Sequence, residues 1–471
     1  MTLEEERAFA QLRAENAELR QLLVAGEVRV AELRQQLAAA LVRIGELEAQ
    51  VDPRGEPPAV EKPSRKPAAG ERPPRKRRAA AHNRSRQRMV ATRVERHALE
   101  HCPECAYRLA GESLDYSRQV IELPPPQPVE VIEHQVVKRW CPHCGRWRSP
   151  QLDLQGQVLG QGRLGVRVAA LVAYLRTTLG VPVAKVQAYL LTLHNLQLSQ
   201  GAIVELAHAV RRQLQGTADQ LLVQVRQQPV VHQDETGWRQ DGQNGYIWLT
   251  ASAGPAAVRY YEYSPSRSHH VAQRLLGNRF QGVLVSDFYA AYNLIPGRHQ
   301  RCWVHLLRDL HKLKEAQAEQ VAVLAWAQAV RQVYDEAQRW LAANPTPTLV
   351  QRQSCYQQYL QRICTLGQQY AFSDQHPCYV LAKRLLRHQD ELFQFVLQPG
   401  VPADNNLAER SLRPLVILRK ISGGTRSDAG TQTRLTLASL LATWQARQLN
   451  PFRECLVALQ QTTPIAHAAS P

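Results

Sequence analysis

A seven-residue repeat of apolar residues runs through residues 3–51 and is compatible with little besides a long amphipathic helix. Its two rows are offset by three and four positions, as the a and d positions of a coiled coil are. Asn16 falls at an a position, where asparagine fixes register and favours two strands. We predict that residues 1–51 form a coiled coil that joins chains into a dimer or higher oligomer; a helix packed on the protein's own body is the alternative. The rows are Phe9, Asn16, Leu23, Val30, Leu37, Ile44 and Val51, and Leu12, Leu19, Gly26, Leu33, Ala40 and Leu47.

Residues 52–96 change character and combine recurring prolines with basic runs such as Arg75-Lys-Arg-Arg78. Such a composition cannot bury a core, so we expect a linker that is either a solvated spacer or a basic arm following phosphates. The whole chain has a formal net charge of +17, which suits nucleic acid or an anionic membrane as partner. No apolar run approaches the ~20 residues of a membrane span, so nucleic acid is favoured. Residues 1–20 do not read as a signal peptide, and we expect a cytoplasmic protein associated with the bacterial nucleoid.

Two Cys-x-x-Cys pairs, Cys102/Cys105 and Cys141/Cys144, supply four thiolates, the ligand set of a closed structural zinc site. Such a site has no open position, which argues against catalysis by this zinc. The alternating runs at residues 119–123 and 129–137 lie between the pairs, split by Pro124-Pro-Pro126. They predict a hairpin, so that the segment as a whole would be a zinc ribbon.

Helical periodicity follows the cysteine pairs. A helix at residues 184–193, a turn ending at Ser199 and a helix at residues 203–214 have the pattern of a helix-turn-helix. Arg211 and Arg212 at the end of the second helix are candidate DNA contacts. A plain helical packing module is an equally good interpretation.

From Pro229 the pattern becomes that of a mixed sheet. Three consecutive strands, a helix, and two further strands are the order of an RNase H-like core. A Gln/Arg/Leu-rich helical stretch then separates this part from a last helix beginning near Asn406, which indicates an inserted helical subdomain. The expected strands are residues 230–232, 245–252, 258–263, 282–286 and 298–303, and the expected helix is 269–276.

Three acids in separate short motifs are the candidate catalytic residues. Asp234 and Asp287 are expected at the ends of apolar strands, and Glu409 on the last helix. Carboxylates that converge in this way can hold two divalent metals for phosphoryl transfer. Each acid alone has a plainer interpretation as a turn or cap residue. The neighbouring Glu235 should point to the opposite face of its strand.

Four motifs in this order resemble bacterial insertion-sequence transposases of the DDE, RNase H-like superfamily. They are Asp-Glu-Thr at 234–236, Ser-Asp-Phe-Tyr-Ala-Ala-Tyr at 286–292, Arg-Cys-Trp-Val-His-Leu-Leu-Arg at 301–308 and Asp-Asn-Asn-Leu-Ala-Glu-Arg at 404–410. The most similar branch carries an N-terminal leucine zipper and a zinc-binding domain ahead of the catalytic core. The resemblance covers nearly the whole chain.

This resemblance implies Mg²⁺-dependent (or Mn²⁺-dependent) cleavage at element ends and strand transfer into target DNA, with Asp234, Asp287 and Glu409 as metal ligands. It further implies double-stranded DNA as partner, and some branches work with accessory proteins. Cys302 and His305 match a Cys-x-x-His signature of the family; they would bind a metal or, as we favour, support the helix start. Candidate DNA contacts after the third acid are Arg410, Arg413 and Lys420. His232 and Trp238, which flank the first acid, are further candidates to bond to DNA or stack on it.

The sequence thus predicts a multidomain α/β transposase; a non-catalytic DNA-binding regulator with a decayed or domesticated RNase H-like core is the alternative. A nuclease acting on hybrids or junctions is a weaker third option. The expected parts are a coiled coil (1–51), a basic linker (52–96), a zinc ribbon (97–150), a helical DNA-binding domain (151–228), the first part of the core (229–311), a helical insertion (312–402) and the C-terminal core helices (403–463).

Overall fold

The computed structural model describes residues 35–36, 89–160 and 162–461. The predicted coiled coil therefore lies outside the described residues, apart from the helical pair Gln35 and Gln36, and so does the linker up to residue 88. The chain divides into two units, residues 1–122 and 123–471. Each unit is considered separately below.

Within the first unit, residues 89–122 form no helix and no strand. Their local order lies around Cys102, whose N–H donates to the carbonyl of Tyr107 at 2.8 Å. The carbonyl of Cys102 accepts from Ala106 at 2.9 Å. Ala106 has a left-handed backbone (φ 57°) that closes this turn.

A hairpin in the second unit holds the other cysteine pair. Strands β1 (Arg139–Cys141) and β2 (Arg146–Arg148) pair antiparallel. The hairpin predicted from residues 119–123 and 129–137 is wrong, because neither run forms a strand. Their alternating apolar side chains have no core to cover: Val120 is 81% exposed and Val131 86%. An isolated two-stranded ribbon without a packed face is marginal in water.

Three helices follow: α2 (Val166–Thr177), α3 (Val183–His194) and α4 (Gln200–Arg226). The Ser199 side chain caps α4 by accepting from the N–H of Ala202 at 3.1 Å, as the polar turn predicted. Helix α4, the second helix of the predicted helix-turn-helix, is longer than expected: it has 27 residues in place of a short recognition helix. Its apolar positions continue to Val225, so the whole length packs on the core.

A five-stranded sheet has the order β5-β4-β3-β6-β7. Strands β3 to β5 form an antiparallel meander. Strand β6 pairs in parallel with the other edge of β3, and β7 pairs in parallel with β6. The predicted order of strands and helix is confirmed. The elements are β3 (Val230–Gln240), β4 (Gln243–Ala251), β5 (Arg259–Ser264), α5 (His269–Leu276), β6 (Val283–Ser286), a 3-10 turn η2 (Ala290–Leu294) and β7 (Arg298–Arg301).

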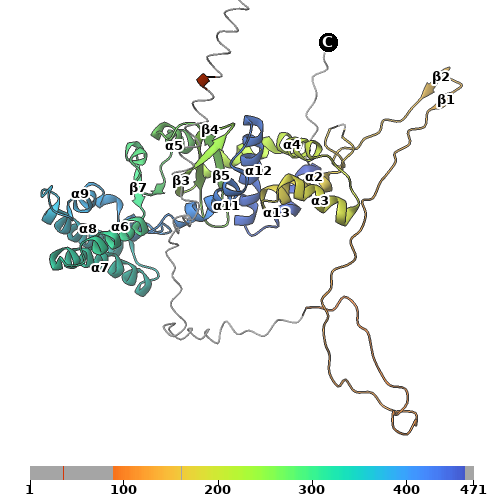
Figure 1. The fold of residues 1–471 in the computed structure, drawn as a ribbon, viewed down its shortest axis with the longest axis horizontal. Helices are drawn as coiled ribbons and strands as arrows, with labels where there is room; N and C mark the ends of the chain where they lie inside the picture. The colour runs from red at the N-terminus through yellow and green to blue at the C-terminus, as the bar shows by residue number, and fades with distance from the viewer. Residues whose placement is uncertain (1–34, 37–88, 161, 462–471) are drawn as a thin grey trace, which may run out of the picture. The chain divides into compact units, whose positions relative to one another are not determined.

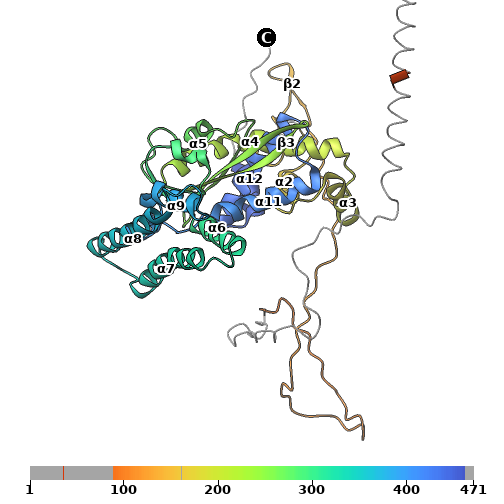
Figure 2. The same cartoon turned by 60° about the vertical axis from the view of Figure 1, so that its left-hand side comes forward.

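Two helices cover one face of this sheet: α11 (Asn406–Ser422) and α12 (Asp428–Ala446). Trp238, Ile247 and Leu249 pack there against Leu412 and Leu415 of α11. The opposite face packs against α4 and α5. Figures 1 and 2 show the sheet between these layers, with α2, α3 and the last helix α13 (Pro451–Gln461) at one end. The sheet is thus buried on both faces.

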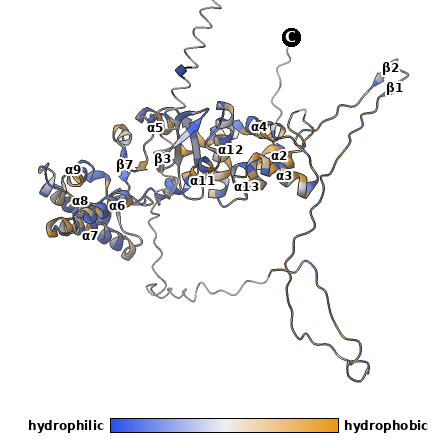
Figure 3. Ribbon diagram, in the orientation of Figure 1, coloured by the Kyte–Doolittle hydropathy of each residue, from blue (hydrophilic) through white to orange (hydrophobic). Residues whose placement is uncertain are grey.

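The stretch between β7 and α11 is helical, as predicted. Its helices share one apolar core with the sheet residues Val283 and Val285, and Trp303 and Phe393 are fully buried in it. Figure 3 shows hydrophobic and hydrophilic residues interspersed along α7 and α8, as expected of helices with one buried face. No helix in the described ranges is long and apolar enough to cross a membrane. The helices are α6 (Trp303–Ala316), α7 (Val321–Ala343), α8 (Leu349–Tyr370), α9 (Tyr379–Arg387), η3 (Gln389–Glu391) and α10 (Gln394–Leu397).

Candidate functional site

Asp234 and Asp287 occupy matching positions on neighbouring parallel strands. Strand β3 pairs with β6 so that His232 lies opposite Val285, and continuing this register by two residues places Asp234 opposite Asp287. Asp287 directly follows β6, as predicted. The expectation that Asp234 ends its strand is wrong, because β3 continues to Gln240 against its antiparallel partner β4. Only the pairing with β6 ends before Asp234.

The alternation of β3 decides which residues share the Asp234 face. His232 contacts Asn405 at the start of α11, and Thr236 accepts a hydrogen bond from Arg419 further along that helix. Since side chains alternate along a strand, Asp234 between them lies on the same face as α11. Glu409 stands in the first turn of this helix, which brings the third acid to the same side of the sheet.

The three acids are close enough to repel one another. Burial is the main cause that raises the pKa of Asp234 to about 8, and the charges of Glu235, Asp287 and Glu409 raise it further. A hydrogen bond from the N–H of Glu235 to the Asp234 carboxylate, at 2.9 Å, opposes this rise. At neutral pH the site therefore favours a proton or a cation at Asp234.

Glu235 belongs to the other face of β3, as the alternation predicted. Its carboxylate accepts from Tyr292 at 2.6 Å and forms an ion pair with Arg267 at 2.7 Å. Burial raises the pKa of Glu235 while these two partners lower it. Glu235 thus joins β3 to the segment that follows Asp287, a structural contact that the sequence did not indicate.

The turn after β6 is held from two directions. The Asp287 side chain accepts from the N–H of Tyr289 at 2.9 Å, and the Asp287 carbonyl accepts from the guanidinium of Arg301 at 2.9 Å. Arg301 is fully buried on β7 and is also paired with Glu391 of the helical region. Burial alone would raise the pKa of Glu391, but His388 and Arg301 lower it to about 2. This ion pair between buried Arg301 and half-buried Glu391 therefore connects the helices between β7 and α11 to the turn that carries Asp287.

Asn405 connects the start of α11 to strand β3, a second contact that the sequence did not indicate. It is 1% exposed, and its side-chain amide donates to the carbonyl of Gln233 at 2.9 Å. Its side-chain oxygen lies 3.0 Å from Nδ1 of His232 and accepts the proton of that nitrogen. Asn405 thus fixes the start of α11, and with it Glu409, relative to the strand that carries Asp234. Asn405 is the N-cap residue of α11, but its side chain makes no capping hydrogen bond; the carboxylate of Asp404 accepts from the N–H of Asn406 at 3.0 Å. A polar residue beside an expected helix start suggests a cap and does not reveal the contact of Asn405 with the strand.

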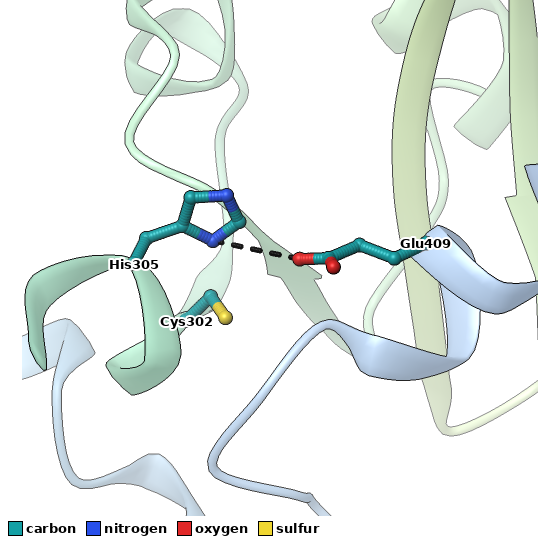
Figure 4. A group of neighbouring side chains, drawn as sticks. All are labelled: Cys302, His305 and Glu409. Atoms are coloured by element: carbon teal, nitrogen blue, oxygen red, sulfur yellow. Dashed lines mark ion pairs between the residues drawn. The ribbon is translucent and has the colours of Figure 1, made fainter. Parts of the chain in front are cut away.

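Cys302 and His305 lie beside Glu409. Nδ1 of His305 is 3.8 Å from a carboxylate oxygen of Glu409. Among the described residues, Cys302, His305 and Glu409 are the one group of three whose possible ligand atoms all lie within 4.8 Å of one another. Figure 4 shows the His305 ring and the Glu409 carboxylate directed at each other from two helices, with the Cys302 side chain next to His305. Asp234, Asp287 and Glu409 are spaced more widely than this trio.

Basic side chains follow Glu409 on the outer surface of α11. Arg410, Arg413 and Lys420 are all exposed. Arg413 lies one turn after Glu409, so the two share a helix face. These three residues are accessible to DNA.

The other candidate DNA contacts fare differently. Arg211 lies in the middle of α4, not at its end, and donates to Gln432 of α12 at 2.8 Å. Arg212 is exposed and pairs with Glu205 at 2.7 Å. The expectation that His232 and Trp238 contact DNA is wrong, because both are 2% exposed. The Trp238 ring donates to Thr425 at 3.0 Å, and burial lowers the pKa of His232 to about 4.

Both cysteine pairs have the same local backbone. In each, the carbonyl of the first cysteine accepts from the residue four positions later, Ala106 or Gly145, at 2.9 Å. Both of these residues have a left-handed backbone, with φ of 57° and 59°. Hydrogen bonds from nearby backbone N–H groups lower the pKa of Cys102 and of Cys141. Such turns favour thiolates, the form that binds zinc.

Two family models match the chain. One, described as the transposase IS66 family, covers residues 161–433 and so includes the sheet, all three acids and the helical region. The other, described as the zinc-finger binding domain of transposase IS66, covers residues 100–145 and so includes both cysteine pairs. The second match supports a structural zinc ion in this segment.

Curated relatives occur in Sinorhizobium fredii (strain NBRC 101917 / NGR234). The uncharacterized protein y4jO is 34% identical over 164 residues, which are 34% of this chain and 47% of the relative. The uncharacterized protein y4qI is 26% identical over 314 residues, 60% of this chain and 57% of the relative. This chain spans about half the length of the curated relatives that it matches.

Proposed function

Since this chain belongs to the transposase IS66 family, we propose that it cuts DNA at the ends of an insertion sequence and joins those ends to target DNA. Family membership suggests a transposase and implies a DNA-processing enzyme and a divalent metal. The residues, the metal chemistry and the assembly described below are our proposal.

We assign residues 229–311 and 403–463 to an RNase H-like core that residues 312–402 interrupt. The order β5-β4-β3-β6-β7, with an antiparallel meander followed by two parallel strands, supports this assignment. So does the placement of the acids, on β3, directly after β6, and on a helix that packs over β3.

Asp234, Asp287 and Glu409 fit a site for divalent cations. They offer only oxygen ligands, which Mg²⁺ and Mn²⁺ prefer. Burial and, after it, the charges of Glu235, Asp287 and Glu409 raise the pKa of Asp234, so its carboxylate is costly to ionise without a cation. A cation would offset this cost, which supports these three residues as its ligands.

Bound divalent metal would supply an activated oxygen nucleophile and stabilise the charge on the departing oxygen. The remaining work belongs to the chain. Asn405 and the β3–β6 register hold the acids in place, and Arg301 fixes the turn after Asp287. Arg410, Arg413 and Lys420 offer positive charge to the DNA backbone next to Glu409.

The other parts have binding roles in this proposal. Cys102, Cys105, Cys141 and Cys144 remain the zinc ligands that their spacing assigns, and the zinc-binding segment and helices α3 and α4 contact the element ends. Arg212 on α4 is a better candidate for such a contact than Arg211, because Arg212 is exposed whereas Arg211 is half-buried and bonds to Gln432 of α12. Residues 1–51 join chains into a dimer or higher oligomer.

The observation that carries the proposal is the placement of three acids on one side of the sheet: Asp234 on β3, Asp287 directly after β6, and Glu409 in the first turn of α11, which packs over β3. The test is a cleavage and strand-transfer assay on the DNA that flanks the gene, with Mg²⁺ or Mn²⁺, comparing the wild type with Glu409→Gln. We expect nicking at a fixed position that depends on metal and falls at least a hundredfold in the variant, while DNA binding is kept.

Strand transfer by Glu409→Gln at the wild-type rate would refute the assignment of the third acid. Specific binding of the flanking DNA without cleavage under either metal would instead favour a non-catalytic regulator. Inverted repeats around the gene would independently support the transposase.

A further inference from the structure

The Cys302, His305 and Glu409 side chains form a cluster that the three-acid site does not explain. Two of its members start helix α6: Cys302 is the residue before the helix, and His305 is its third residue. Side chains at these two positions of a helix start approach each other, as they do in a capping box. The spacing Cys-x-x-His therefore brings a sulfur and an imidazole together, and Glu409 adds a carboxylate from α11.

Two polar atoms of the cluster lack a partner. Nδ1 of His305 and a carboxylate oxygen of Glu409 are both buried without a hydrogen bond. They face each other at 3.8 Å, which is too long for a hydrogen bond. Two ligands at about 2.0–2.2 Å from one ion lie at most about 4.4 Å apart, so an ion fits between them. Buried polar groups are normally satisfied, and an ion here would satisfy both.

The position of the Cys302 sulfur is fixed by its surroundings. Cys302 is fully buried, and its Sγ accepts the backbone N–H of Asn405 at 3.2 Å. A hydrogen bond to a ligand from the surrounding shell is a general feature of metal sites. Asn405 is itself held by Gln233, so the position of the N–H donor is fixed.

We propose that Cys302, His305 and Glu409 bind a transition-metal ion of the zinc type, at a site distinct from that of Asp234 and Asp287. One thiolate, one imidazole and one carboxylate suit Zn²⁺ or Co²⁺, whereas Mg²⁺ does not bind thiolate. Binding replaces the thiol proton of Cys302, which passes to solvent. Three protein ligands leave a fourth position for water or a phosphate oxygen.

Glu409 belongs both to this cluster and to the three-acid site. Glu409 can serve the oxygen-ligand site and the cysteine–histidine site, so an ion held by Cys302 and His305 fixes the Glu409 carboxylate on the α6 side. Metal binding at the trio does not depend on strand transfer. It can therefore be tested in a protein that proves inactive on DNA.

The test is metal content of the full-length chain, loaded with Zn²⁺ or Co²⁺ alone and freed of loosely bound ions by gel filtration. We compare the wild type with Cys302→Ser and with the control Cys355→Ser, a half-buried cysteine on α8 outside the cluster. We expect the wild type and the control to retain one ion more per chain than Cys302→Ser. With Co²⁺, the difference spectrum should contain a thiolate-to-cobalt charge-transfer band. Equal metal content and identical spectra in all three proteins would overturn the proposal.

A second variant covers the case in which Cys302→Ser does not fold. His305→Gln changes a side chain that is 29% exposed and leaves the buried sulfur in place. We expect its Co²⁺ affinity at this site to fall more than about tenfold, with the zinc-finger ion unaffected. Unchanged affinity in His305→Gln would show that the trio holds no ion.

Discussion

The zinc-binding segment and the three-acid site both involve metal, but they differ in what holds them together. Around the cysteine pairs the apolar side chains are exposed: Ile121 is 74% and Leu123 84% exposed. The three acids, in contrast, are positioned by a sheet buried on both faces and by helix α11, which packs on that sheet. In the first region metal has to supply the stability that a core would give. At the three-acid site the core supplies the stability, and a bound metal would offset the cost of burying the acids close to one another.

The largest expected effect tests the first half of this comparison. Cys141→Ser should lose one zinc ion per chain and make residues 100–145 sensitive to protease, because zinc contributes on the order of 10 kcal/mol to the folding of small zinc domains. Zinc analysis and limited proteolysis measure this, with Cys355→Ser as the control. The midpoint of core unfolding should stay unchanged. A loss of the core along with the segment would break the comparison.

The next effect concerns the core itself. Asn405→Ala removes two side-chain hydrogen bonds and leaves the His232 ring and the Gln233 carbonyl buried without partners. We expect the free energy of unfolding to fall by about 3 kcal/mol, with zinc content unchanged. Urea unfolding measures the loss, and the neighbouring Asn406→Ala is the matched control. Equal stability of the two variants would mean that the Asn405 network does not hold α11 on the sheet.

Replacing Asp234 by asparagine is expected to stabilise the metal-free protein at alkaline pH. Because its pKa is raised to about 8 in the folded protein, the folded state binds more protons than the unfolded state. Metal-free wild type therefore loses stability as pH rises from the ordinary carboxyl range to about 8, and below that range the effect vanishes. Asp234→Asn should be more stable by about 2 kcal/mol at pH 8 and about equal at pH 4.

Thermal unfolding in chelator at both pH values measures this gain. Added Mg²⁺ should stabilise the wild type and not the variant. If Asp234→Asn destabilised the protein at pH 8, the repulsion assigned to the acidic site would be absent.

The smallest expected effect tests whether basic residues next to the three-acid site bind DNA independently of the zinc-binding segment. Arg413→Ala should weaken DNA binding by about 1 kcal/mol and reduce the salt dependence by about 0.9 log units, the contribution of one phosphate contact. Binding titrations at several salt concentrations test this. The control is Arg331→Ala, which alters an exposed arginine on α7 that pairs with Asp335. An equal response in both variants would remove Arg413 from the interface.

Local patterns predicted the secondary structure of the core well. Apolar β-branched runs located the strands, and Asp287 was correctly placed at the end of β6 because that run is short and fully buried. Asp234 was misplaced because polar residues continue β3 against a partner, and pairing is not visible in one run of sequence. The runs at 119–123 and 129–137 failed for the opposite reason, since alternation predicts a strand only where a core lies beneath one face.

The contacts around the candidate site were less predictable. Asn405 and Arg301 act through partners that are 172 and 90 residues away in the chain, and composition gives no sign of such distances. Burial of Trp238 could not be separated from stacking on DNA, since an aromatic residue beside an acid suits either. The Cys-x-x-His spacing did indicate proximity, because helix geometry fixes it locally.

The ion pair between buried Arg301 and half-buried Glu391 bears on how such a chain can change over evolution. Loss of helices α7 to α10 would leave the guanidinium charge of Arg301 in the interior without its counter-ion, at a cost of roughly 3–5 kcal/mol. The same guanidinium supports the turn that carries Asp287. The inserted helices are therefore not a detachable module: a lineage that shortened them would have to replace Arg301 in the same step. Covariation of positions 301 and 391 is the trace that this constraint would leave among homologous sequences.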